Sequence, residues 1–170
     1  MTSIPELRCA LCGGAIAAHE NYFRATGQFL PAKDPLTTYC GAPLHWHCYA
    51  QWPERPRFAR RYVEAWQAAN RKNPFWWSVY ADEQVYVSVN PERPVEEVSI
   101  RLYEVGSDIR VPLRRWSEWL ENADLVTPNL QPVERQALRA VLPTLRQRFP
   151  DDRSVVFAID EDEKTSRRRG

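Results

Sequence analysis

The sequence contains little cysteine, histidine or glycine, and neither sign of charge is in excess. Among 170 residues there are four cysteines, three histidines and six glycines, and 23 basic residues balance 22 acidic ones. Balanced charge removes the general attraction to nucleic acids and anionic membranes. No apolar run is long enough for a transmembrane helix, and the start MTSIPELRCA does not fit a signal peptide. We therefore expect a cytoplasmic protein with no membrane partner.

Aromatic residues and prolines are, in contrast, frequent. Phe, Trp and Tyr make up 12% of the chain, and apolar residues make up 44%. This composition is enough to bury a core and argues against general disorder. The 14 prolines against six glycines predict short helices and strands, because proline ends or interrupts both.

The apolar pattern predicts helices and strands in alternation. A helix is expected over 44–72, interrupted at Pro53 and Pro56, and its apolar stripe comprises Phe58, Tyr62, Ala65, Trp66 and Ala69. Short β-type runs with alternating residues predict an antiparallel sheet of three or four half-buried strands, at 76–80, 84–90, 98–102 and 109–111.

The C-terminal third predicts two more helices and a last strand. The helices are expected over 112–122 and from Pro132 to Phe149, with Pro143 kinking or splitting the second. The apolar run SVVFAI at 154–159 is typical of a buried strand. We divide the chain into residues 1–72, which carry all the cysteines and histidines, a small α+β region at 73–160, and a disordered tail at 161–170.

Two pairs of potential metal ligands give the most specific pattern in the chain. Cys9 and Cys12 are separated by two residues, 32 residues follow, and His45 and Cys48 are again separated by two. Structural zinc takes four thiolate or imidazole ligands in a tetrahedron, and this short spacing lets both members of a pair reach one ion. Gly13 and Gly14 can supply the positive-φ turn after the first pair. The pattern predicts one zinc ion held by these four side chains.

These residues resemble the treble-clef class of zinc fingers, and the CxxC…HxxC pattern is similar to the first half of a LIM-type module over residues 7–66. The 32-residue gap is longer than in a LIM module, and no second set of four ligands follows. The resemblance implies a structural zinc site formed by a knuckle and a helix start. The fold class expected is α+β, with a treble-clef-like finger packed on a small antiparallel sheet with flanking helices.

Other ligand assignments remain open at this level. Cys40 could replace His45 to give a four-cysteine site, or it could be a reduced cysteine of the core. The spacing does not distinguish zinc from iron. His47 is adjacent to Cys48 at the expected helix start, where neighbouring residues point in different directions, so it is expected to be exposed or hydrogen-bonded and not a ligand. His19 lies in a polar stretch and is expected to be solvated.

Three functions fit the sequence, and the first is favoured. A non-enzymatic, zinc-stabilised protein would bind a protein partner. A nucleic-acid-binding protein would instead use the arginine-rich helix 55–72, with Arg57, Arg60 and Arg61 as candidate anion-binding residues. A zinc-dependent hydrolase is the third. No HExxH, deaminase, phosphate-loop or nucleophile-elbow motif is present, so no catalytic residue is predicted.

Overall fold

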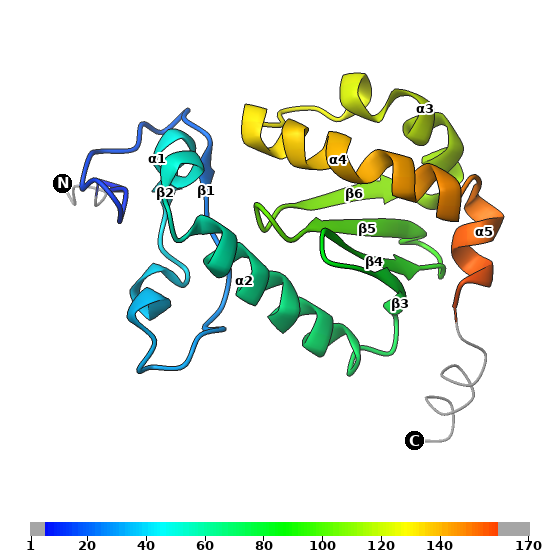
Figure 1. Ribbon diagram of the computed structural model, residues 1–170, viewed down its shortest axis with the longest axis horizontal. Helices are drawn as coiled ribbons and strands as arrows, with labels where there is room; N and C mark the ends of the chain where they lie inside the picture. Colours follow the sequence, from blue (N-terminus) through cyan, green and yellow to red (C-terminus); the bar gives the residue numbers. More distant parts are fainter. Residues whose placement is uncertain (1–5, 160–170) are drawn as a thin grey trace.

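The computed structural model describes residues 6–159 and places helices on both faces of a four-stranded antiparallel sheet (Figure 1). The order of the strands in the sheet follows the chain: β3 (Trp77–Ala81), β4 (Val85–Asn90), β5 (Glu97–Leu102) and β6 (Asp108–Pro112). Each strand pairs with the next in a hairpin, which confirms the predicted antiparallel sheet. The predicted tail at 161–170 lies outside the described residues.

Three helices cover the first face of the sheet. They are α3 (Trp116–Val126), α4 (Pro132–Arg148) and α5 (Asp152–Phe157). Branched side chains of the two central strands point into this layer, and all are fully buried: Val85, Val87, Val89, Val98, Ile100 and Leu102. This layer forms the larger hydrophobic core, and its period-two pattern is the one that the sequence indicated.

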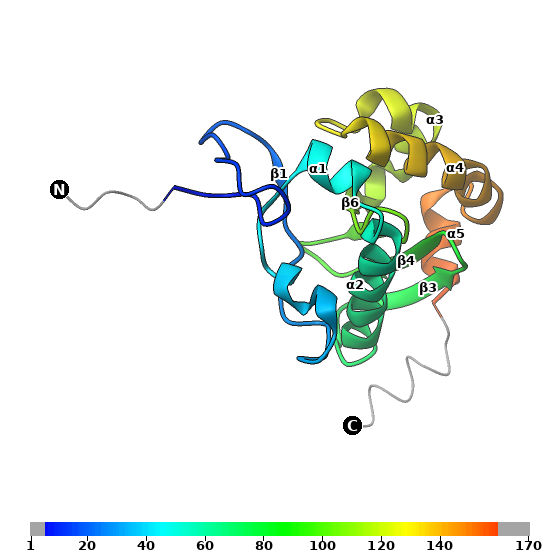
Figure 2. The ribbon, with the colours of Figure 1, turned by 60° about the vertical axis from the view of Figure 1, so that its left-hand side comes forward.

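Helix α2 (Arg55–Asn70) covers part of the second face, which is polar but also buried (Figure 2). Strand β4 is buried at all six positions, so the prediction of a half-buried strand was wrong. The Asn70 Nδ2 donates to the hydroxyl oxygens of Tyr86 and Ser88, at 3.1 and 3.2 Å. Hydrogen bonds of this kind allow polar side chains to be buried beneath a helix.

The N-terminal part has its own, smaller core. Strand β1 (Tyr22–Phe23) pairs with β2 (Leu44–His45), and α1 (Trp46–Gln51) follows β2 directly. A 3-10 helix at Pro35–Tyr39 lies in the connection between the two strands. The predicted helix over 44–72 is therefore a short strand and two helices, and the break between α1 and α2 contains Pro53.

Contacts near the β5–β6 turn join the two parts. The Tyr49 hydroxyl in α1 donates to the Val105 carbonyl oxygen at 2.9 Å. The Tyr49 ring stacks on Phe23, with 3.8 Å between ring centroids. Gly106, at φ +72°, leaves little room for a side chain, because an added Cβ would lie 3.3 Å from Tyr62 Cδ1, a tight contact, and 3.5 Å from Phe23 Cζ.

Gly106→Ala is expected to lower the free energy of unfolding by about 2 kcal/mol, because it adds a close contact to the strain of a left-handed backbone. Gly27→Ala is a matched control, since Gly27 has φ +81° with no atom within 4 Å of an added Cβ. That variant should lose only about 1 kcal/mol. Urea unfolding followed by circular dichroism measures both. Equal losses would contradict the close packing of the β5–β6 turn against α2 and β1.

Two local predictions were wrong, and one is settled in part. Residues 154–159 do not form a strand, because Asp151 begins helix α5 by accepting the Ser154 N–H at 2.7 Å. At Pro143, where a kink or a split was expected, helix α4 is not split, and the proline lies on its exposed face. Ala69 is exposed and Val63 is buried, because the buried stripe of α2 is rotated from the predicted one.

Candidate metal centre

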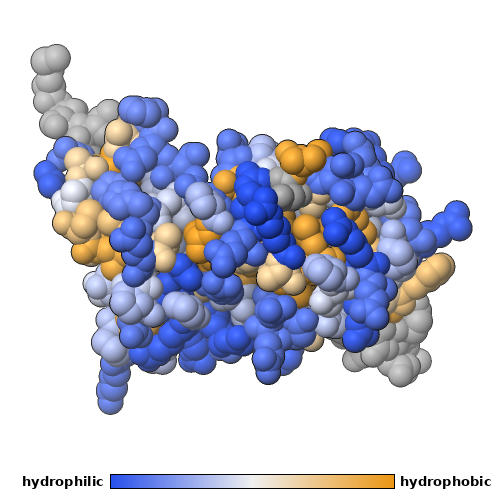
Figure 3. Space-filling view, turned by 45° about the horizontal axis from the view of Figure 1, so that its top comes forward, coloured by the Kyte–Doolittle hydropathy of each residue, from blue (hydrophilic) through white to orange (hydrophobic). Residues whose placement is uncertain are grey.

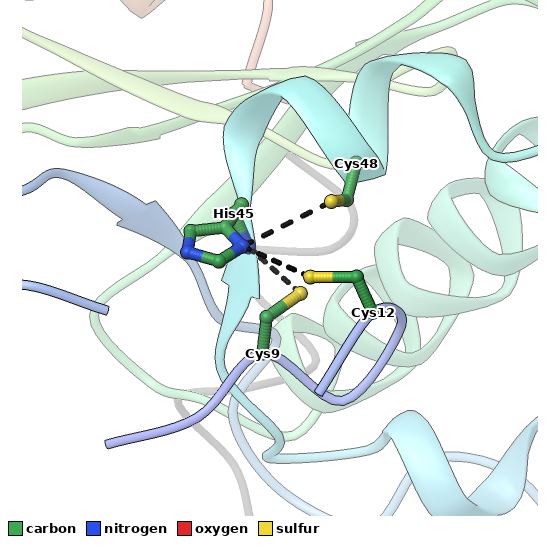
Figure 4. Close-up of side chains that lie close together, drawn as sticks. All are labelled: Cys9, Cys12, His45 and Cys48. Atoms are coloured by element: carbon green, nitrogen blue, oxygen red, sulfur yellow. Dashed lines mark hydrogen bonds between the residues drawn. The ribbon is translucent and has the colours of Figure 1, made fainter. Parts of the chain in front are cut away.

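The first ligand pair lies in a tight knuckle (Figure 4). The Cys9 N–H donates to the Gly14 carbonyl oxygen at 2.9 Å, and the Gly13 N–H donates back to the Cys9 carbonyl oxygen at 2.8 Å. Gly13 has φ +73°, as the sequence predicted for this turn. The Gly14 N–H points at the Cys12 sulfur at 3.4 Å. The turn therefore directs a backbone donor toward a cysteine sulfur.

The second pair lies where β2 passes into α1. His45 is the last residue of β2, and Cys48 is in the first turn of α1. The His45 N–H donates to the Cys9 sulfur at 3.3 Å. Pairing of β2 with β1 and this hydrogen bond position the helix start over the knuckle, so two ligand pairs far apart in sequence meet at one point.

The four ligand atoms lie within 4.8 Å of one another. His45 Nδ1 is 3.4 Å from the Cys12 sulfur and 3.9 Å from the Cys48 sulfur. A tetrahedral zinc ion with standard bond lengths separates nitrogen and sulfur ligands by about 3.6 Å. Nδ1 is thus the ring nitrogen that faces the cysteines. The geometry and the three-cysteine, one-histidine set both fit one zinc ion.

The other ring nitrogen of His45 has its own partner. Nε2 lies 3.1 Å from the Ala15 carbonyl oxygen and 3.8 Å from a Glu20 carboxylate oxygen. A histidine that binds a metal through Nδ1 carries its proton on Nε2 and commonly donates it to a carbonyl or carboxylate. These two groups therefore hold the ring in the orientation that metal binding needs.

The thiol groups influence one another's ionisation. Burial opposes ionisation of Cys9, but the N–H groups of Cys12, His45 and Leu11 outweigh it and lower the Cys9 pKa to about 7. Burial, together with the neighbouring Cys12 and Cys9, raises the pKa of Cys48 to about 12. Hydrogen bonding to Cys12 raises the pKa of His45. A divalent cation removes the repulsion between thiolates, so this cluster is suited to a bound metal.

The other cysteine and histidines lie outside this group. Cys40 is half-buried at the end of the 3-10 helix and is not among the four clustered residues. His47 is exposed, and its ring stacks on the His45 ring with 4.9 Å between centroids. His19 is exposed. The positions of His47 and His19 agree with the predictions made from sequence, whereas Cys40 lies outside the cluster in which it was an alternative to His45.

The three candidate anion-binding arginines are exposed on α2, and each already has an internal partner. Arg57 forms an ion pair with Asp34 at 3.0 Å. Arg60 donates to the Glu83 carbonyl oxygen at 2.8 Å, and Arg61 pairs with Glu64 at 3.3 Å. Their role in binding an anion stays a prediction, and phosphate contacts would compete with these pairs.

Sequence reasoning missed buried polar residues on the second face of the sheet and beside the β5–β6 turn. Arg101 is 3% exposed and forms an ion pair with Asp108 at 2.9 Å. Glu134, at the start of α4, is also buried and accepts the Ser107 hydroxyl at 2.6 Å. The alternation of Ser99 and Arg101 with apolar residues was the available signal, but it was taken as a solvent-facing side.

No helix among residues 6–159 combines the length and apolar character needed to cross a bilayer. No family model matches the chain, and neither the curated proteins nor the solved structures include a significant match. What can be said of function therefore rests on the local geometry. The protein is a mixture of helices and strands with a cluster of side chains suited to a metal ion.

Proposed function

We propose that the chain is a non-enzymatic, zinc-stabilised binding protein with a treble-clef-like finger. The observation that carries this proposal is the convergence of three cysteines and one histidine from a knuckle and a helix start. The order of knuckle, β1–β2 pair and α1 supports the treble-clef assignment. On this proposal residues 1–72 form the zinc module and residues 73–160 form a second α+β region.

The ligand number supports a structural role for the zinc. Four protein ligands complete a tetrahedron, whereas catalytic zinc keeps one position for water or substrate. The metal would also hold together the ends of the 32-residue segment between Cys12 and His45, which is entropically costly to order without such a link. The favourable free energy of zinc binding is then folding free energy for the module.

A protein is the partner that the surface favours. At the C-terminal end of α3, Leu125 is 84% exposed and Val126 is 46% exposed. Figure 3 shows hydrophobic side chains in small groups among hydrophilic ones on the face that it presents. Adjacent exposed apolar residues are typical of a contact surface for another protein. The internal pairing of Arg57, Arg60 and Arg61 makes α2 less suited to nucleic acid.

Elemental analysis of natively purified protein, with a thiol titration, tests the metal assignment. We expect about one zinc per chain, as one structural site requires, and one reactive thiol, from Cys40. Protein without metal and with four reactive thiols would contradict the proposal. Binding to an oligonucleotide that weakens steeply with salt, and is lost in the Arg57→Ser, Arg60→Ser, Arg61→Ser triple variant, would instead establish the nucleic-acid function.

A further inference from the structure

A cavity of about 350 Å³ lies where the N-terminal part meets the sheet. Five aromatic residues line it from β1, α1 and α2: Tyr22, Phe23, Trp46, Tyr62 and Trp66. Residues of β5, β6 and the turn between them form the other wall, with Arg101 and Asp108 among them, and Arg24 and Glu134 complete the lining. Its volume falls in the range of small-molecule sites, which often lie between two packed units of a protein.

Arg101 is the most unusual residue in this cavity. Its guanidinium lies over the Trp66 ring, 4.0 Å from the ring centroid, and one terminal nitrogen pairs with Asp108. The buried Nε–H of Arg101 has no hydrogen-bond partner in the part of the chain that the structure describes. Burying a charged donor without a partner costs free energy, and groups of this kind are uncommon away from functional sites.

The charges around the cavity favour an anion. Three arginines and two carboxylates line it: Arg24, Arg101, Arg110, Asp108 and Glu134. Asp108 accepts hydrogen bonds from both Arg101 and Arg110, at 2.9 Å each. Glu134 accepts from the Ser107 hydroxyl and from the backbone N–H of Gln131. Arg24 donates to the Gly41 carbonyl oxygen at 2.6 Å, and Arg110 also pairs with Glu97, outside the lining, at 3.5 Å. The lining itself carries three positive and two negative side chains, an excess of one positive charge.

We propose that this cavity binds a small organic anion, a phosphate or carboxylate carried on a planar ring. Arg101 and Arg110 hold the anionic group, because guanidinium groups donate to both oxyanions in a fixed geometry. Phe23, Tyr62 and Trp66 contact the ring, since aromatic side chains favour stacked or edge-on contact with another ring. This site is separate from the four metal ligands and goes beyond the proposed role of the zinc module.

Isothermal titration calorimetry on the zinc-loaded full chain tests the site with defined probes. The ring anions are phenyl phosphate and benzoate. The matched partial probes are inorganic phosphate, acetate and benzyl alcohol. We expect at least one ring anion to bind roughly tenfold more tightly than any partial probe, because only it engages both halves of the cavity. The preference between the two ring anions identifies the anionic group. No binding of either ring anion at millimolar concentration would overturn the proposal.

Variants then locate the binding. Arg110→Gln, at a half-exposed side chain, is expected to weaken binding roughly tenfold through loss of a charged hydrogen bond, and Arg101→Met at least as much. Arg114→Gln is the charge-matched control, because Arg114 is exposed and does not line the cavity. If Arg101→Met fails to fold, Arg24→Gln with Arg110→Gln carries the test. Equal weakening by Arg114→Gln, or none by the cavity variants, would overturn the assignment.

Discussion

Cys9→Ser is expected to reduce the zinc content from about one per chain to nearly none and to unfold the N-terminal part. Cys9 is 1% exposed, and its sulfur accepts the His45 N–H, so the substitution removes both a ligand and a link to the knuckle. A structural zinc site contributes on the order of 10 kcal/mol to folding. Elemental analysis measures the metal, and hydrogen exchange of residues 6–70 measures the unfolding.

Cys40→Ser is the matched control for this prediction. Cys40 packs at the edge of the same small core as Cys9 but lies outside the ligand cluster, so the variant should retain about one zinc. Chelation of zinc from the wild-type chain should reproduce the exchange pattern of Cys9→Ser. A Cys40→Ser protein that purifies without zinc, or a Cys9→Ser protein that keeps it, would contradict the ligand assignment.

Trp116→Ala is expected to lower the free energy of unfolding by about 3–5 kcal/mol, the usual range for a fully buried aromatic residue. Trp116 is fully buried, its Nε1–H donates to the Phe149 carbonyl oxygen at 2.7 Å, and its ring stacks on Trp119. The substitution leaves a cavity between α3 and the sheet and an unpaired carbonyl group. Urea unfolding of the zinc-loaded chain measures the loss.

Phe157→Ala is the matched control, because it removes an aromatic ring that is not buried. Phe157 is 81% exposed, so its truncation should change stability by no more than about 0.5 kcal/mol. Trp116→Phe should lie between the two, because phenylalanine fills part of the space but cannot donate to Phe149. If the Trp116→Ala and Phe157→Ala variants unfolded at the same urea concentration, this would contradict the burial of Trp116 in the core.

The sheet and the cluster could be predicted because both rest on short-range patterns. Val85, Val87 and Val89 alternate as a strand requires, and the spacing of Cys9 with Cys12 and of His45 with Cys48 is set by the reach of neighbouring side chains to one point. The metal itself, and the roles of these four residues as its ligands, stay predictions.

Errors arose where tertiary context decides. The run at 154–159 has strand-type composition, but all four strands of the sheet are supplied by earlier residues, and Asp151 caps a helix there instead. Arg101 looks like a solvent-facing residue of an alternating strand. Only the packing of α2 and Trp66 over the second face shows that it is buried, and no local pattern specifies which helix covers that face.

Strands β3 and β6 are the edge strands of the sheet, and no further strand among residues 6–159 pairs with their outer sides. Such edges can pair with another copy of the chain and start aggregation. Strand β6 carries charged Asp108 and Arg110 and ends at Pro112, which has no N–H to donate. Strand β3 has a register shift between Ser78 and Tyr80, and such irregularities interrupt edge-to-edge pairing. Arg110 lines the cavity and also lies on this edge, where its charge discourages self-association. The Arg110→Gln variant keeps a polar side chain there.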